Sequence, residues 1–239
     1  MRNLSRTIIP ISEGRPSPPS YQDALIWAAE NPATGRKRDV TRARLLAATA
    51  RVMGANTYAG LRVADIAASA GMSSAAFHVY FVDRDEAARE VLSGLLRRLY
   101  VSDPDAGPCG AHAFVPTIRS HIEALQNDAP LVQALNQAVR LDGILAELSD
   151  CAVRLWRARL DTMFGGSSEN DLEVDASAAP DVLDLIIAGI RQRAGAPLLT
   201  PDAMSRVATE IGRAWAAVRK ARPRSGFLVG AHGQRSPAG

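Results

Sequence analysis

The sequence contains few cysteines and no long run of uncharged apolar residues. Two cysteines, Cys109 and Cys151, in 239 residues are too few for a disulfide framework, and no CxxC or CxxH pair indicates a zinc site. The longest apolar stretch, Leu185 to Ile190, is far shorter than the roughly 20 residues that span a bilayer. The patch from Ile8 to Ile11 is too short for the core of an export signal. We therefore expect a cytoplasmic chain without a membrane segment. Its cysteines are expected to be small buried apolar side chains, with a redox-sensing thiol as the alternative.

Motifs of common enzymes are absent as well. The sequence has no GxGxxG, no GxxxxGKS or GxxxxGKT, no GxSxG and no HExxH. Its four histidines, at positions 78, 112, 121 and 232, are too far apart in sequence to indicate a local metal site. We therefore expect a protein that is not an enzyme and that uses no cofactor and no metal.

Charge is distributed unevenly along the chain. Residues 1–101 carry a net charge of +5, residues 102–218 carry −7, and residues 219–239 carry +5. A basic front and an acidic middle are expected when the front meets a polyanion and the middle does not. Ordinary surface scatter would give the same totals, so charge alone does not decide between the two.

The first third of the sequence predicts a leader followed by two helices. Four prolines before residue 20 and the lack of periodicity predict a mobile leader. Ser20 is a suitable N-cap for a short helix from Tyr21 to about Glu30. A long helix is predicted from Val40 to Gly54, because apolar residues recur on one face of it.

The strongest pattern in the chain is that of a helix-turn-helix over Leu61 to Phe81. Ala67, on the first short helix, is small enough to let two helix axes approach each other. Gly71 follows four residues later and tolerates the left-handed backbone of a turn. A second short helix begins at Ser73, its N-cap, and directs Phe77 toward the core.

Helical periodicity continues through most of the remaining chain. A helix follows Asp83, which forms a capping box with Glu86, and runs to about Tyr100. Further helices are predicted near 112–127 (bent or broken at Pro116), 130–138, 141–164, 180–194 and 201–221. No alternating, strand-like run occurs, so the predicted fold is all-α. We divide the chain into a mobile extension with one short helix (1–35), a helix-turn-helix domain (36–82), a helical domain (83–221) and a disordered basic tail (222–239).

These motifs also follow one another in a recognisable order: a long basic helix, the helix-turn-helix, and a capped helix after an aromatic residue. The residues concerned are Thr41 to Ala48, Val63 to Ala67, Ala70 to Ser73, Phe77, Tyr80, Phe81 and Asp83 to Glu86. Over about residues 38–96 this order resembles the TetR-like (tetracycline-repressor) family. The resemblance implies a homodimeric repressor that binds operator DNA through its three amino-terminal helices. It also implies that the carboxy-terminal helices hold a small ligand and the dimer interface.

The sequence departs from the family pattern in the helix-turn-helix from Leu61 to Phe81, which is predicted to contact DNA and which we call the reading head. Leu61-Arg62 stands where relatives usually place a hydroxyl cap, and Ser74-Ala75 replaces a Lys-Gly pair. His78 replaces a tyrosine that touches phosphate, whereas Arg84 stands where the family has a lysine close to backbone phosphate. We therefore expect base-edge hydrogen bonds to carry less of the specificity than usual, with phosphate contacts compensating.

The predicted double-stranded DNA contacts are of three kinds. Serine and histidine side chains can bond to base edges, alanine and valine can pack on thymine methyl groups, and arginines can bind phosphate. The basic arm from Arg36 to Arg38 is expected to enter a narrow minor groove, unless it is only a solvated charge run. The full set is Arg36, Lys37, Arg38, Arg42, Arg44, Arg62, Ser73, Ser74, Ala75, Ala76, His78, Val79, Tyr80 and Arg84.

A homodimer on a palindromic operator is expected, because a single reading head makes few contacts. The apolar stripes of the last two predicted helices can form a four-helix interface with a second copy, or can bury only within their own subunit. The predicted dimer residues are Leu183, Ile186, Ile187, Ile190, Val207, Ile211, Trp215 and Val218.

The middle helices are expected to surround a small, largely apolar effector. The predicted pocket residues are Phe114, Ile118, His121, Ile122, Asn136, Leu148, Cys151, Leu155 and Trp156. A plain core is the alternative to a pocket. The competing function is a DNA-bound adaptor whose carboxy-terminal domain binds a protein, which a solid core with an exposed apolar patch would favour.

Overall fold

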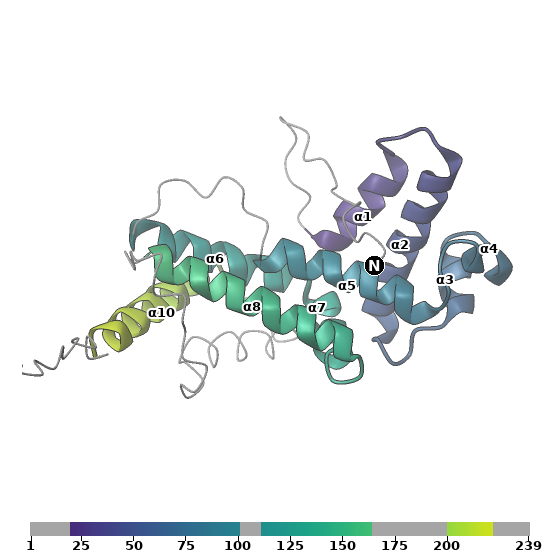
Figure 1. The fold of residues 1–239 in the computed structure, drawn as a ribbon. Coiled ribbons are helices and arrows are strands. Elements are labelled where there is room, and N and C mark those ends of the chain that lie inside the picture. Colours follow the sequence, from purple (N-terminus) through teal and green to yellow (C-terminus); the bar gives the residue numbers. More distant parts are fainter. Residues whose placement is uncertain (1–19, 101–110, 164–199, 222–239) are drawn as a thin grey trace, which may run out of the picture.

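The computed structural model describes residues 20–100, 111–163 and 200–221, and all regular structure in these ranges is helical. The predicted all-α fold is therefore confirmed. The helices are α1 (Tyr21–Glu30), α2 (Lys37–Asn56), α3 (Val63–Ser69), α4 (Ser74–His78), α5 (Arg84–Tyr100), α6 (Ala111–Asn127), α7 (Ala129–Ala138), α8 (Gly143–Met163) and α10 (Pro201–Ala221). Figure 1 shows an elongated arrangement, with α3 and α4 at one end and α10 at the other.

Helix starts follow the predicted caps. The hydroxyl of Ser20 accepts a hydrogen bond from the backbone N–H of Asp23, at 3.0 Å, and begins α1. A carboxylate oxygen of Asp83 accepts one from the N–H of Glu86, at 2.7 Å, and begins α5. These side chains satisfy amide groups that have no partner within the first helical turn, which explains why both helices begin where the sequence predicts.

Two predicted helix limits differ from the structure. α2 begins at Lys37 rather than Val40, because the N–H groups of Asp39 and Val40 donate to the carbonyl of Arg36. Lys37 and Arg38 therefore lie in the first turn of α2 and not in a separate arm. α6 continues through Pro116, so of the predicted break or bend the break is not present.

A shared core joins the helix-turn-helix to the following helices. α5 packs against α2 on one side and against α8 on another. Its side chains Val91, Leu92 and Leu95 are buried in the same cluster as Phe77 of α4 and Ile122 of α6. The helix that follows the reading head is therefore a structural part of both halves of the protein.

α1 lies across this junction. It packs along α2, and its first backbone N–H, that of Tyr21, donates to a carboxylate oxygen of Asp128 at 2.6 Å. Asp128 lies in the turn between α6 and α7, and its other oxygen is 3.6 Å from Nε of Arg98. Burial raises the pKa of Asp128, and the hydrogen bond from Tyr21 and the charge of Arg98 oppose that rise. Burial also raises the pKa of Tyr21 to about 12.

Some predictions fall outside the described residues. These are the leader 1–19, the helix at 180–194, the tail 222–239 and Cys109. The other cysteine, Cys151, is exposed, so its predicted burial is wrong. Within the described ranges no helix is both long and apolar enough to cross a bilayer, and no cluster of potential metal ligands occurs.

Candidate nucleic-acid interface

The turn between α3 and α4 is built around Gly71. Its φ of 69° lies in the left-handed region, which glycine adopts without a steric penalty. The turn closes through a hydrogen bond from the N–H of Met72 to the carbonyl of Ala67, at 2.8 Å. Ser73 then caps α4, its hydroxyl accepting from the N–H of Ala76 at 3.2 Å. The sequence predicted the glycine and the cap in these roles, and both are confirmed.

Two aromatic side chains hold α4 against the core. Phe77 and Phe81 are both fully buried, with ring centroids 5.5 Å apart. The opposite side of α4 faces outward, and Val79 is 68% exposed there. The exposed predicted contacts on this helix and its cap are Ser73, Ser74, Ala75, His78 and Val79, whereas Ala76 and Tyr80 are only partly exposed. Since Tyr80 also packs on the hydrophobic core, it offers less of its side chain to DNA than predicted.

His78 is oriented by a bond within the chain. Its Nδ1 lies 3.1 Å from the carbonyl oxygen of Val82, and a carbonyl can only accept, so Nδ1 carries the proton. In a neutral ring Nε2 is then an acceptor. The exposed ring can therefore accept a hydrogen bond from an exocyclic amine of adenine or cytosine in the major groove.

Exposed cations flank the reading helix. Arg36, Lys37, Arg38 and Arg44 lie on α2 or at its start, and Arg62 immediately precedes α3; all five are exposed. The structure adds Arg51 on α2, an exposed cation that was not among the predicted DNA contacts. Its regular spacing from Arg44 along the helix could have indicated it.

Arg42, a predicted phosphate contact, has a partner within the chain. Its two terminal nitrogens donate to both carboxylate oxygens of Glu90 on α5. The guanidinium also lies over the ring of Phe81, 5.1 Å from its centroid. Arg42 therefore fastens α2 to α5 beneath the reading head. Glu90 is 48 positions away in sequence, and no local pattern could have indicated this pair.

Arg84 also has partners inside the chain. Its Nη1 donates to the carbonyl oxygens of Leu61, at 2.6 Å, and of Ala59, at 3.1 Å, and its Nε lies 3.5 Å from Asp85. These contacts tie the start of α5 to the loop between α2 and α3. Arg84 thus supports the reading head from behind, and its predicted contact with phosphate stays a prediction.

One comparison with known proteins identifies this arrangement. The family model of bacterial regulatory proteins, tetR family, matches residues 45–91, which run from α2 into α5. The chain carries a tetR-family DNA-binding domain. It is a DNA-binding transcriptional regulator, and regulators of this family are not enzymes. No curated protein is similar enough to the chain to count as a match.

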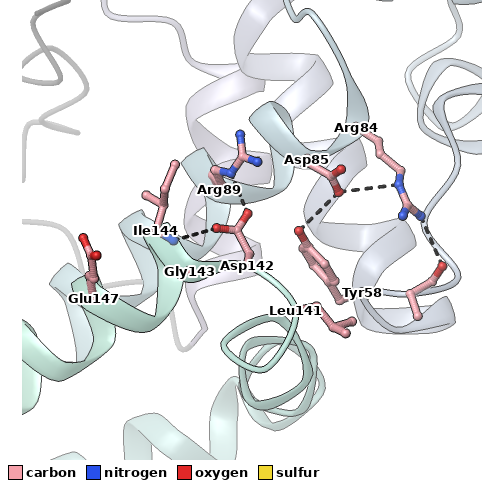
Figure 2. A pocket seen from close by; sticks show the side chains of 10 residues that line it. Tyr58, Arg84, Asp85, Arg89, Leu141, Asp142, Gly143, Ile144 and Glu147 are labelled. Atoms are coloured by element: carbon pink, nitrogen blue, oxygen red, sulfur yellow. Dashed lines mark hydrogen bonds and ion pairs between the residues drawn. The ribbon is translucent and has the colours of Figure 1, made fainter.

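A pocket of about 720 Å³ lies where the tetR-family domain meets α8 (Figure 2). Tyr58 donates to a carboxylate oxygen of Asp85 at 3.2 Å, and Nε of Arg89 donates to Asp142 at 2.6 Å. Burial, together with the neighbouring Asp85, raises the pKa of Tyr58 to about 12. The lining residues are Tyr58, Ala59, Arg84, Asp85, Arg89, Leu141, Asp142, Gly143, Ile144 and Glu147.

Asp142 connects the two sides of this pocket. Its carboxylate accepts from Arg89 on α5 and from the backbone N–H groups of Ile144 and Leu145 at the start of α8. Burial alone would raise the pKa of this carboxyl, but the hydrogen bonds outweigh burial and lower the pKa. Asp142 thus caps α8 and binds it to the helix that leaves the tetR-family domain.

The predicted ligand pocket is not assembled by the structure. Ile118, Ile122 and Trp156 are buried in the common core, and none of the predicted pocket residues lines the pocket of Figure 2. His121 is buried beside Trp156, with ring centroids 4.3 Å apart, and its Nδ1 is 3.0 Å from the carbonyl oxygen of Leu99. Asn136, on α7, is partly exposed.

Of the remaining four predicted pocket residues, three are exposed on α8 and one has a side chain outside the described residues. Leu148, Cys151 and Leu155 are exposed on the outer side of α8, so these three do not line a cavity within the described chain. They belong to an apolar row that turns away from the core. The side chain of Phe114 lies outside the described residues.

The structure describes two side chains of the predicted dimer set. Ile211 of α10 is buried within its own chain, where α10 packs against α6, so it is not a free contact for a second copy. Val207 is partly buried and packs on the same core. Leu183, Ile186, Ile187 and Ile190 lie outside the described residues, as do the side chains of Trp215 and Val218.

Proposed function

We propose that the protein is a homodimeric repressor that binds a palindromic operator through α4 and leaves it when a small effector binds. The observation that carries this proposal is the outward face of α4, held rigidly by the buried rings of Phe77 and Phe81. A short helix that is anchored on one side and exposed on the other can enter a major groove. Two such heads on successive grooves, about 34 Å apart, would give useful affinity.

The chemistry of this face indicates how DNA would be read. Ser73 and Ser74 can donate to or accept from base edges, and Nε2 of His78 can accept from an exocyclic amine. Ala75 and Val79 can pack on thymine methyl groups. Lys37 and Arg62 would supply contacts with phosphate, which raise affinity for every sequence alike.

Selection of duplexes from a random pool tests this proposal, with the wild-type protein compared with His78→Ala and Lys37→Ala. The wild type should enrich a palindromic site. The change at His78 should relax the preference at one position in each half-site, at a cost of about 1–3 kcal/mol for the preferred base. The change at Lys37 should weaken binding to all duplexes. It should also reduce by about 1 the salt slope, which is the steepness with which the logarithm of the binding constant falls with the logarithm of salt concentration. Enrichment of no sequence, or an unchanged preference in His78→Ala, would contradict the proposed reading.

We further place effector binding at the pocket of Figure 2 rather than among the buried middle-helix residues. Arginines and carboxylates line this pocket beside Leu141 and Ile144, so its ligand would carry polar groups and would not be purely apolar. A ligand there would contact Arg84, which bonds to the loop before α3. It could therefore shift the equilibrium between two positions of the reading head, by an amount limited by its preference for one of them.

Gly143→Leu tests the placement of the effector. A Cβ at Gly143 meets no atom within 4 Å, so a larger side chain can occupy the pocket without strain. Compounds that release DNA from the wild type should not release it from this variant, whereas affinity for the operator should remain unchanged. Release of both proteins at the same effector concentration would place the effector elsewhere.

The adaptor alternative has one observation in its favour. The outer side of α8 exposes an apolar row, and the predicted apolar pocket residues whose side chains the structure describes are either packed or turned outward. An exposed patch of this kind is typical of a protein-binding surface. An operator complex that no small molecule releases would favour the adaptor.

A further inference from the structure

Val82 is an apolar side chain that the fold leaves in water. It lies between the buried Phe81 and Asp83, the cap of α5, and its side chain is 77% exposed. Of the large apolar side chains whose exposure the structure describes, it is the most exposed. An apolar residue directly before a helix cap often packs on the fourth residue of the helix, here Ala87, which is buried. Val82 keeps most of its surface free instead, so it adds little to the stability of α5.

Hydrogen bonds on both sides of Val82 fix its backbone. Its N–H donates to Oε2 of Glu86 at 2.6 Å, and its carbonyl oxygen accepts from Nδ1 of His78 at 3.1 Å. A β-branched side chain also has few accessible χ1 rotamers. The isopropyl group of Val82 is therefore held in place before a partner arrives, and a contact with it costs little conformational entropy.

The bond with His78 places Val82 at the edge of the outward side of α4. His78 and Val79 are exposed on that side, and Figure 1 shows α4 at one end of the molecule. One ring nitrogen of His78 bonds to the carbonyl of Val82, and the other, Nε2, is the acceptor for a base. Successive bases are about 3.4 Å apart along a strand, so a base that bonds Nε2 would lie within about two base pairs of Val82.

A valine side chain can recognise only an apolar group, because it has no donor and no acceptor. Among the base edges in the major groove, the C5 methyl group of thymine is the apolar one. Contact between this methyl group and Val82 would remove apolar surface of both molecules from water. The group on DNA that matches Val82 is therefore the methyl of a thymine.

We propose that Val82 determines part of the operator specificity by packing on the C5 methyl group of one thymine in each half-site. This rests on the proposed reading of DNA by α4, and it adds a residue that is not among the predicted DNA contacts. Uracil lacks the methyl group and keeps every hydrogen-bonding group of thymine. Replacement of thymine by uracil therefore isolates the contact with Val82.

Fluorescence anisotropy of the full chain would compare the selected operator with duplexes that carry uracil at one thymine position of each half-site in turn. At one position, within about two base pairs of the position that His78→Ala affects, the wild type should lose affinity about fourfold for each half-site. This is the factor expected for the burial of one methyl group. Val82→Ala removes both methyl groups of the side chain but keeps the carbonyl that orients His78. It should bind the thymine and uracil duplexes equally and keep the wild-type preference at the position that His78 reads.

Cytosine and 5-methylcytosine provide a second pair of bases that differ only in the C5 methyl group. Placed at the position found with uracil, 5-methylcytosine should bind the wild type about fourfold more tightly than cytosine for each half-site. Val82→Ala should not distinguish the two. Equal binding of both duplexes by the wild type would contradict a contact with the methyl group.

Leu155→Ala is the matched control, since it shortens an exposed apolar side chain on α8, which Figure 1 shows away from α4. It should keep the wild-type loss on uracil substitution, and all variants should unfold at the same urea concentration. Two further results would overturn the proposal: a wild type that binds thymine and uracil duplexes equally at every position, and a Val82→Ala protein that keeps the full loss. Either result is compatible with an enriched palindrome and with the predicted effect of His78→Ala, so the reading of DNA by α4 would stand. Enrichment of no site would overturn both proposals.

Discussion

Replacement of Arg84 by alanine separates the two roles that this residue can have. As a phosphate ligand, Arg84 would raise the affinity for DNA and would steepen the salt slope of DNA binding by about 1. The structure instead directs its guanidinium to the carbonyl oxygens of Leu61 and Ala59, 2.6 and 3.1 Å away. The variant should therefore lose stability and not electrostatic attraction for DNA.

The expected magnitude follows from the bonds that are lost. A hydrogen bond from a charged donor contributes about 1.5–3 kcal/mol. Arg84 makes two from a single nitrogen, but its side chain is 37% exposed, so water compensates part of the loss. We expect Arg84→Ala to lower the free energy of unfolding by about 2 kcal/mol. The loop before α3 should also lose protection against hydrogen exchange, because α5 no longer holds it.

Arg62→Ala is the matched comparison. Arg62 is exposed and occupies the N-cap position of α3, but its side chain makes no capping hydrogen bond. Urea titration would measure stability, and fluorescence anisotropy between 50 and 200 mM salt would measure the salt slope of operator binding. Arg62→Ala should lower the slope by about 1 and leave stability within about 0.5 kcal/mol of the wild type. Arg84→Ala should do the reverse. A stable Arg84→Ala protein whose salt slope falls by one unit would refute the internal role of Arg84.

Two further substitutions test contacts on which the arrangement of the helices depends. Alanine at Gly94 would place its Cβ 1.8 Å from the phenolic oxygen of Tyr21, so Gly94→Ala should displace α1 and cost about 1–3 kcal/mol in a thermal or urea melt. In Gly54→Ala, also within a helix, the added Cβ meets only ordinary contacts at 3.4 Å or more, so this control should be neutral or stabilising. Equal free energies of unfolding for the two variants would exclude the clash at Gly94. Asp142→Asn should lower the free energy of unfolding by about 1–3 kcal/mol at pH 7, because it weakens the pair with Arg89. The folded pKa of Asp142 is lowered, so its contribution is complete above an unfolded pKa of about 4 and is lost as pH falls through the folded pKa. A difference between wild type and Asp142→Asn that grows on acidification would contradict this sign.

Local features of the reading head could be predicted from the sequence because their causes are local. Gly71 adopts positive φ and Ser73 caps α4, and both effects act within four residues of backbone. The same holds for Ser20 at α1 and for Asp83 with Glu86 at α5. In each case a residue type and its distance from the next apolar residue are sufficient to locate the helix end.

Partners that are distant in sequence could not be predicted in this way. Arg42 and Arg84 both appeared suitable for phosphate, yet one meets Glu90 on α5 and the other meets carbonyl groups of an earlier loop. Nothing near either arginine signals these partners, because only the packing of α2 against α5 brings them together.

The two faces of α8 illustrate the same limit. Helical periodicity identifies Leu148 and Leu155 as apolar positions, but it does not show which of two apolar faces the core covers. An apolar residue on a helix can be buried within its chain or remain free for another molecule. The pocket prediction failed at these positions for that reason.

The bond between Tyr21 and Asp128 limits how this protein can be recombined with its relatives. It closes a loop of 107 residues and fastens a helix that precedes the matched tetR-family region to a turn well beyond it. A chimera that takes another protein's reading head therefore needs more than a junction at α5. It must also include α1, keep a glycine at position 94 and keep a carboxylate at position 128. Otherwise the chimera will lack the contact that holds α1 against the turn between α6 and α7.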